Sequence, residues 1–346
     1  MTRFLAILTV RNEGAFLLEW LAHHKAVGFT DFLIFSNDCA DGTDAMLDRL
    51  AAMGEITHVP NPGPHKRGPQ WDALKTAADH PALHAADWAM VMDVDEFVNV
   101  HVGNHTLTAL LNALPQATAI PLTWRVFGNA GVVSFTDKPV TETFTRAAPK
   151  RLLWPWRASM FKTLFKLDGS YAKLGVHRPR AMATGATPRW FDGAGRELGP
   201  DMYEGRPFSQ PGQDNYALAQ LNHYPLGAME SYIVKLDRGR ANRADEPVGM
   251  DYWCERNWSS AEDHSIAAIT PMRDPIWARL AADNELADLH AGAVRWRRDR
   301  FHTLMQQERY RQLFGRLAMT PPAREIPASV VKMIIQAAQN AARTRD

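Results

Sequence analysis

The first hundred residues alternate between two hydrophobic periods, and this alternation restricts the fold more than any other feature of the sequence. A seven-residue apolar run, Phe4 to Val10, precedes a stretch of helical period from Ala15 to Val27 that Gly28 would end. Further strand-like runs occupy residues 32–38, 55–59 and 88–92, with helical patterns between them. Strands and helices that alternate at this spacing predict an α/β fold of doubly wound type, with a mostly parallel sheet flanked by helices.

The rest of the chain has a different composition. Residues 119–222 combine many Pro, Gly, Trp and basic residues with short β-like runs, which is typical of a variable, substrate-facing region. Helical patterns dominate from Met229 onward. We therefore expect one domain, residues 1–228, that contains the sheet, and a helical C-terminal region, residues 229–346, packed on that core.

Charge and cysteine content exclude several classes of protein. The 39 basic and 38 acidic residues nearly cancel, so no global field attracts nucleic acid. The two cysteines, Cys39 and Cys254, lie outside any CxxC pattern, which favours a reducing cytoplasm and excludes a disulfide framework. The run "MTRFLAILTV" resembles a signal peptide, but no small-residue cleavage site follows it. Because no apolar segment approaches the roughly 18 residues of a spanning helix, we expect a soluble, cytoplasmic protein.

An acidic cluster follows the strand-like run at residues 88–92. In the segment "MVMDVDEF", Asp93 and Asp95 stand two residues apart, so in a continuous strand they project to the same face. Ligands of open α/β sheets bind beyond the carboxyl ends of the strands. Two close carboxylates favour a hard divalent cation, Mg²⁺ or Mn²⁺, which could in turn hold a diphosphate. The alternative is that these acids are solvated or cap a helix.

Five segments together resemble a known family. They are "RNEGAFLLEWLAHHKAVGFTDFLIFSNDCADGTD" (11–44), "DVDEF" (93–97), "WRVFGNAG" (124–131), "GVHRP" (175–179) and "NHYPLGAMESYIVKLDRG" (222–239). In order and spacing they resemble the GT-A fold glycosyltransferases, in particular a family-2-like branch, over roughly residues 3–240. The resemblance implies a GT-A type, Rossmann-like sheet and transfer of a sugar from a nucleotide sugar, with a DxD pair that binds the metal and the diphosphate.

The resemblance also implies roles for individual residues. Asp95 is similar to the direct metal ligand, and Asp93 to the acid that shares the ion or reaches the donor ribose. Arg11, Asn12 and Glu13 follow the first strand, where the family places the base and ribose of the nucleotide. The alternative for these three residues is a turn held by local hydrogen bonds.

Four further residues complete the expected donor site. Asn37 stands where related enzymes carry an aspartate, which leaves the choice of nucleotide open, although we expect uridine diphosphate (UDP). The basic loop "PHKRGPQW" contains Lys66 and Gln70 and could clamp a diphosphate or simply be solvated. Lys235 lies on a helix face that could meet phosphates or face the solvent.

The third metal ligand and the catalytic base are less clearly indicated. His223 is the preferred metal-binding histidine, with His177 as the alternative. An inverting transfer requires a carboxylate that takes the proton of the acceptor hydroxyl. Glu142 is the candidate base, and Asp192 and Asp263 remain open, as does a retaining reaction without a side-chain base.

We therefore predict a metal-dependent glycosyltransferase that moves a hexose from a UDP-sugar to a saccharide or glycolipid acceptor. A nucleotidyltransferase and a non-catalytic sugar-binding scaffold are the rival functions. The arginine- and aromatic-rich stretch 295–317 either packs on the core or attaches the protein to the inner face of a membrane. The sequence predicts no nucleic-acid partner and indicates no oligomeric state.

Overall fold

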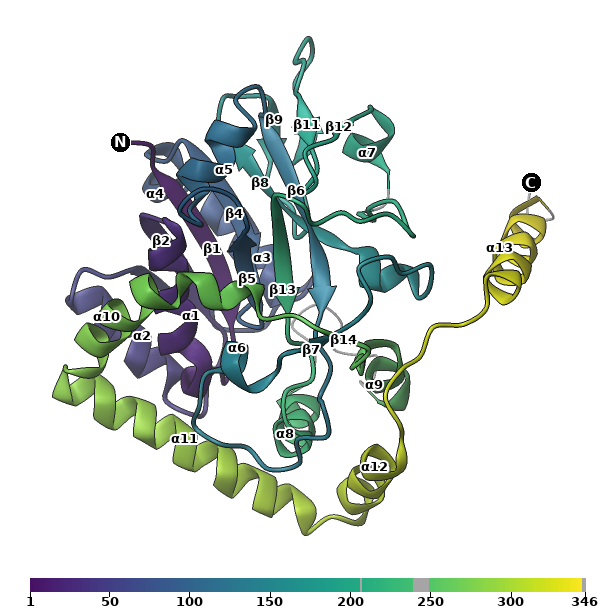
Figure 1. Ribbon diagram of the computed structural model, residues 1–346. Helices are drawn as coiled ribbons and strands as arrows, with labels where there is room; N and C mark the ends of the chain where they lie inside the picture. Colours follow the sequence, from purple (N-terminus) through teal and green to yellow (C-terminus); the bar gives the residue numbers. More distant parts are fainter. Residues whose placement is uncertain (206, 239–248, 344–346) are drawn as a thin grey trace.

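A ten-stranded sheet forms the centre of the molecule (Figure 1). The computed structural model describes residues 1–205, 207–238 and 249–343 of the chain. In the sheet, β12, β11, β6, β8, β4, β1, β2 and β3 are neighbours in that order, and β13 joins β5 to β6. The strands of the described chain are β1 (Phe4–Val10), β2 (Asp31–Ser36), β3 (Thr57–Pro60), β4 (Trp88–Met92), β5 (Glu96–Val100), β6 (Ala119–Val126), β7 (Arg146–Ala147), β8 (Phe161–Lys166), β9 (Tyr171–Lys173), β10 (Arg180–Met182), β11 (Trp190–Phe191), β12 (Glu197–Leu198), β13 (Ala219–His223) and β14 (Ala261–Glu262).

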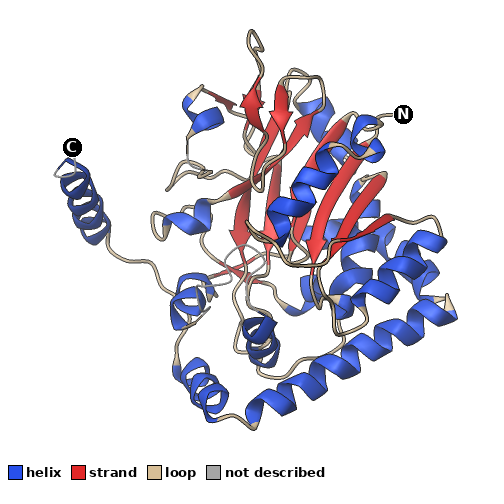
Figure 2. Cartoon of the chain, turned by 180° about the vertical axis from the view of Figure 1, so that it is seen from behind, coloured by secondary structure: helices blue, strands red, loops and turns tan. Residues whose placement is uncertain are grey.

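Helices cover both faces of this sheet, as Figure 2 shows from the opposite side. The helices are α1 (Gly14–Val27), α2 (Thr43–Ala52), α3 (Pro69–Ala78), α4 (Pro81–His84), α5 (Leu107–Ala113), α6 (Val140–Thr143), α7 (Asp201–Glu204), α8 (Met229–Arg238), α9 (Met250–Arg256), α10 (Thr270–Ala281), α11 (Asn284–Met305), α12 (Glu308–Met319) and α13 (Ala328–Arg343), with 3₁₀ turns at Trp156–Ser159 and Ser265–Ile269. Strands β1 to β4 run parallel, and β8 lies antiparallel between β4 and β6. The expected fold class, a mostly parallel α/β sheet flanked by helices, is confirmed.

The sequence of β1 explains why this strand occupies the centre of the sheet. Side chains on a strand alternate between its two faces. Phe4, Ala6 and Leu8 belong to the hydrophobic cluster on one face of the sheet, and Leu5 and Ile7 to the cluster on the other. A strand buried on both faces therefore reads as the continuous apolar run seen in the sequence.

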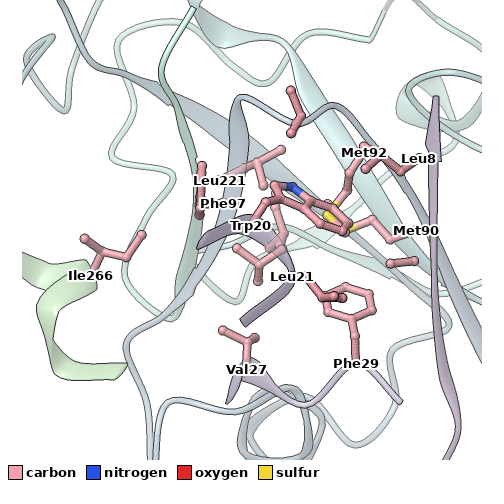
Figure 3. Close-up of a cluster of buried hydrophobic side chains, with 14 of the residues drawn as sticks. Leu8, Trp20, Leu21, Val27, Phe29, Met90, Met92, Phe97, Leu221 and Ile266 are labelled. Atoms are coloured by element: carbon pink, nitrogen blue, oxygen red, sulfur yellow. The ribbon is translucent and has the colours of Figure 1, made fainter. Parts of the chain in front are cut away.

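Helix α1 packs its aromatic and aliphatic side chains against the first of these faces. Figure 3 shows Trp20 and Leu21 among Leu8, Met90 and Phe97. Burying each side chain of this size contributes about 1.5–3 kcal/mol. At the end of α1, Gly28 adopts a left-handed backbone with φ 112°, and its amide donates to two carbonyls of the last turn, which confirms the expected helix end.

The helical C-terminal region packs on the core through α10 and α11, which both contact α1. In the stretch 295–317, Phe301, Leu304, Tyr310 and Leu317 are buried in a cluster shared with α8 and α9, so this stretch packs as one of the two alternatives predicted. Helix α13 stands apart from the rest of the chain (Figure 1). Among the described residues, every helix is too short or too polar to span a membrane. The domain boundary at residue 228 and a membrane contact remain predictions.

Candidate active site

The acidic residues lie in a tight turn between β4 and β5, which corrects the sequence-based geometry. The structure ends β4 at Met92 and begins β5 at Glu96, so strand alternation does not apply to Asp93 and Asp95. The amide of Glu96 donates to the carbonyl of Asp93 at 3.0 Å, and the amide of Asp93 donates to Oε2 of Glu96 at 2.9 Å. As a result, the two aspartates contact different partners.

Asp93 is held by a buried lysine from β8. Lys162 is fully buried and its Nζ lies 2.9 Å from Oδ2 of Asp93 and 3.6 Å from Oε2 of Glu96. Gln70, at the start of α3, donates to Oδ1 of Asp93 at 3.1 Å. Burial lowers the pKa of Lys162, but the carboxylates of Asp93 and Glu96 outweigh it, so its pKa lies above the usual value and the ammonium stays charged.

Asp95 contacts a second lysine and a histidine. Nζ of Lys235, on α8, donates to Oδ2 of Asp95 and to the carbonyl of Pro225, both at 2.7 Å. Nε2 of His223, at the end of β13, lies 3.8 Å from the same carboxylate oxygen. Burial raises the pKa of Asp95, but the charge of Lys235, its hydrogen bond and the charge of Lys162 together outweigh burial, so the pKa falls below its usual value. The structure therefore brings Asp95, His223 and Lys235 together, and their roles in binding a metal or the donor remain predictions.

Glu96 is part of the turn and points into the core. Its Oε1 accepts a hydrogen bond from Nε1 of Trp124 at 2.7 Å. Burial raises the pKa of Glu96 to about 8, with Lys162 opposing this effect. Glu96 therefore orients the turn between β4 and β5 from within the core.

The two candidate histidines flank the indole of Trp124. The ring centroids of His223 and Trp124 lie 4.1 Å apart, and those of His177 and Trp124 5.9 Å apart. Burial lowers the pKa of His223 to about 3 and that of His177 to about 4. Both rings are therefore neutral at pH 7, and Nδ1 of His177 bonds the carbonyl of Phe161 at 2.9 Å.

The residues predicted to bind the nucleoside lie at the carboxyl ends of β1 and β2. Asn12 has φ 54°, and its Oδ1 accepts from the amide of Ala40 at 2.7 Å. Nδ2 of Asn37 donates to the carbonyl of Val10 at 2.8 Å. Their side chains thus link the loops after β1 and β2 through hydrogen bonds between residues 27 and 28 positions apart, and their contacts with a nucleotide remain predictions.

Three other predicted donor residues lie close to these loops. Arg11 is exposed, and the amide of Glu13 donates to Oγ1 of Thr43 at 3.0 Å. Lys66 is exposed in the loop before α3, which also presents Gln70 to Asp93. The edge of the sheet therefore collects the predicted residues, while their contacts with a nucleotide remain predictions.

A cavity, here called the aromatic cavity, opens beside Asp95, and the hollow measures about 650 Å³ including the space open to solvent. It lies between the start of α1, the segment 132–144 and residues 224–235. Asp95 of the acidic turn and its partner Lys235 line the cavity together with Glu13, and aromatic side chains form much of the wall. The cavity is thus continuous with the charged site.

The three candidate bases lie elsewhere. Glu142 is half exposed and forms an ion pair with Arg273, and the described residues that line the aromatic cavity include its neighbours Val140 and Thr143 but not Glu142. Asp192 pairs with Arg196. The structure therefore does not bring Glu142 to the cavity, and its role as catalytic base remains a prediction.

The third candidate base, Asp263, pairs with Arg125 and accepts from Gln220 at 3.1 Å.

The predicted metal site is incomplete in protein ligands. No three His, Cys, Asp or Glu side chains of the described chain converge in a way that could hold a metal ion. Of the three predicted ligands Asp93, Asp95 and His223, the last two lie within 3.8 Å of each other in the described part of the chain.

The sequence-based prediction did not assign Lys162 or Trp124 to the site. Lys162 lies within the stretch 119–222, which the sequence indicates as substrate-facing, yet it contacts Asp93. A lysine inside the apolar run "FKTLF" of β8 was the available signal, because a lysine is almost never fully buried unless it is paired. The partner could not be read from the local sequence.

An acidic turn at the carboxyl edge of a mostly parallel sheet, with two lysines and a cavity beside it, defines a ligand-binding α/β protein whose site suits a charged ligand. The sequence model of glycosyltransferase family 92 matches residues 9–191 of the 346. The chain therefore belongs to glycosyltransferase family 92. This confirms the predicted glycosyltransferase class at the level of the family, whereas nothing bears out the finer, family-2-like assignment.

Two curated relatives are also described as glycosyltransferase family 92 proteins. One, from Oryza sativa subsp. japonica, is 27% identical over 151 residues, which cover 41% of this chain and 24% of the relative. The other, from Ricinus communis, is 26% identical over 144 residues, which cover 39% and 25% of the two chains. The chain thus matches only about a quarter of the length of these relatives.

Similar solved structures include S. aureus TarS, with a TM-score of 0.31 and 12% identity over 48% of this chain and 28% of that one. Another is glucosyl-3-phosphoglycerate synthase from Mycobacterium tuberculosis, with a TM-score of 0.24 and 18% identity over 36% and 44% of the chains. Because both TM-scores are so low, the chemistry of this chain is inferred from its own residues.

Proposed function

We propose that this protein transfers a hexosyl group from a UDP-sugar to a saccharide or glycolipid acceptor. The observation that carries the proposal is the acidic turn at the carboxyl edge of the sheet, where Asp93 and Asp95 each contact a lysine ammonium beside the aromatic cavity. Membership of glycosyltransferase family 92 supports the reaction class. The match covers only about a quarter of each curated relative, so the donor and the acceptor are proposed from the residues of this chain.

The proposed reaction exchanges one bond for another at the anomeric carbon. The acceptor hydroxyl oxygen forms a bond to this carbon, the bond to the diphosphate oxygen breaks, and UDP leaves with the bonding electrons. A general base takes the hydroxyl proton. Lys235 is proposed to stabilise the charge that develops on the diphosphate, because its ammonium is charged and partly accessible beside Asp95.

A divalent cation, Mn²⁺ or Mg²⁺, fits part of this arrangement. Asp95 offers a carboxylate oxygen and His223 a neutral imidazole, 3.8 Å apart, and Nδ1 of His223 has no hydrogen-bond partner within the described chain. Such ions commonly take one or two protein ligands and complete their shell with substrate phosphates. When bound, the cation would supply positive charge to the diphosphate. Asp93, held by Gln70 and Lys162, is proposed to share the ion or to accept from the ribose.

Calorimetry with UDP, with and without Mn²⁺, tests the donor site. We expect UDP to bind more tightly with Mn²⁺ and a screen of nucleotide sugars to show metal-dependent UDP release. UDP binding that is indifferent to Mn²⁺ would favour the scaffold function, and pyrophosphate release from a nucleoside triphosphate would favour the nucleotidyltransferase.

The catalytic base is tested with Glu142→Gln. If Glu142 is the general base, turnover should fall at least about 100-fold while the affinity for UDP stays unchanged. Unchanged turnover would remove Glu142 from the mechanism and leave the transfer itself in place.

A further inference from the structure

The walls of the aromatic cavity are more apolar than recognition of a bare sugar requires. Phe16, Phe97, Phe135, Phe144 and Tyr224 all line it. Sugars can stack on one or two aromatic rings, but their hydroxyls also need hydrogen-bond partners, since polar groups buried without partners cost free energy. Five aromatic side chains around one hollow instead suit a ligand with a substantial apolar group.

Arg297 is a buried cation in the wall of the same cavity. It projects from α11, is 6% exposed, and its guanidinium lies 4.4 Å from the ring centroid of Phe16 and 5.7 Å from that of Phe135. Burial lowers its pKa to about 10, so the group stays charged at neutral pH.

This guanidinium is incompletely satisfied within the described chain. Nε and Nη2 donate to the hydroxyl and carbonyl of Ser231 at 3.3 and 3.4 Å, and no described residue accepts from Nη1. The carboxylate of Asp41 favours the charge electrostatically, yet Arg297 forms no ion pair with any described acid. Contacts with aromatic rings stabilise a cation, but the rings do not replace an anion as the acceptor of its N–H groups.

Buried charges in proteins are normally paired, because an unpaired charge in an apolar environment costs several kcal/mol. An anion in the cavity would complete the hydrogen bonds of Arg297. Lys138 lines the same cavity and adds a second positive charge. The cavity thus combines apolar walls with a cation that has no carboxylate partner among the described residues.

Building on the glycosyltransferase function proposed above, we propose that the aromatic cavity binds the acceptor, and that this acceptor is an anionic amphiphile. Its apolar group lies against the five aromatic side chains, and its carboxylate or phosphate pairs with Arg297. Asp95 and Lys235 line the same cavity, so an acceptor bound there lies next to the proposed donor site.

Calorimetry without any nucleotide sugar tests this proposal with small probes. The anionic probes are 4-nitrophenyl β-D-glucuronide, which carries a carboxylate, and 4-nitrophenyl phosphate. The neutral probe with the same ring is 4-nitrophenyl β-D-glucoside, and glucuronic acid lacks the ring. We expect at least one anionic aryl probe to bind roughly tenfold or more tightly than both the neutral glycoside and glucuronic acid. The anionic probe that binds more tightly identifies whether the cavity prefers a carboxylate or a phosphate.

The matched variants are Arg297→Met and Arg295→Met, which alter a buried and an exposed arginine of α11. Arg297→Met should abolish the preference for the anionic probe, and Arg295→Met should retain it. Equal affinity for anionic and neutral probes, or a preference that survives in Arg297→Met, would overturn the proposal. If Arg297→Met fails to fold, Arg297→Lys, which keeps the charge, should retain the preference, and its loss there would also overturn the proposal.

Two further readouts separate anion binding by Arg297 from a structural role of this residue and from loss of the donor site. A purely structural role for Arg297 predicts a lower midpoint of thermal unfolding in Arg297→Met, whereas the proposal predicts no decrease, because the unpaired buried charge is removed. UDP binding is measured on the same samples. Intact UDP binding without anion preference refutes only the acceptor site, and anion preference without UDP binding refutes only the proposed donor.

Discussion

Replacing His23 by glutamine should make the protein less sensitive to acid. His23 lies on α1, is 1% exposed, and its Nε2 lies 2.8 Å from the carbonyl of Val98, while Nδ1 has no hydrogen-bond partner among the described residues. Burial lowers the pKa of His23 to about 4 from a usual value of 6.5. The folded protein therefore disfavours the protonated imidazole.

The sign and size of the effect follow from these two values. Between pH 6.5 and about 4 the unfolded chain binds a proton that the folded chain does not, so the free energy of unfolding falls as the pH falls through this range. At about 1.36 kcal/mol per pH unit, His23 alone lowers stability by about 2 kcal/mol between pH 7 and pH 5. This loss is roughly one eighth to two fifths of a typical free energy of unfolding of about 5–15 kcal/mol. Buried His24 acts in the same direction, and Glu96, with its raised pKa, in the opposite one.

Urea unfolding of wild type and His23→Gln at pH 7 and pH 5 isolates the contribution of this residue. Glutamine retains an Nε2 donor for Val98 and does not titrate, so the stability lost between the two pH values should be about 2 kcal/mol smaller in the variant. His264→Gln, at an exposed histidine, should behave like wild type. Identical pH dependence of wild type and His23→Gln would refute the assignment of a depressed pKa to this buried ring.

Three further predictions concern the acidic turn. Asp95→Asn should reduce UDP release at least about 100-fold and leave the thermal unfolding midpoint within a few degrees of wild type, because asparagine keeps an oxygen that can accept from Lys235 but loses the charge proposed to act on the donor; unchanged turnover would contradict its role. Lys162→Met should lower the free energy of unfolding, measured in urea, by about 3 kcal/mol. This value is at the low end for a broken buried ion pair because the side chain of Asp93 is 38% exposed. Lys166→Met, at the exposed end of β8, is the control, and equal stabilities of the two variants would contradict a stabilising Lys162–Asp93 pair. Lys235→Met should weaken UDP binding measured by calorimetry roughly tenfold, and an unaltered dissociation constant would exclude a contact with the diphosphate.

Local sequence determined the secondary structure that carries the site. The apolar run of β1, the helical period of α1 and Gly28 at its end involve residues close together in the chain, so their pattern predicts them directly. The same reasoning placed Asp93 and Asp95 at the edge of the sheet, because parallel strands end there. It failed at the turn after Met92, since so short a break in strand geometry leaves no periodic signal.

Only the tertiary structure decided what surrounds these acids. Lys162 reaches Asp93 across 69 residues because β8 inserts antiparallel beside β4, and Lys235 reaches Asp95 across 140 residues from α8. Arg297 enters the aromatic cavity because α11 packs on α1 and α8. Such contacts depend on strand order and helix packing, which arise from burial of the whole apolar surface rather than from any local pattern. The sequence by itself therefore determined where charge collects, and the packing of distant elements decided which cations face it and how the adjoining cavity is lined.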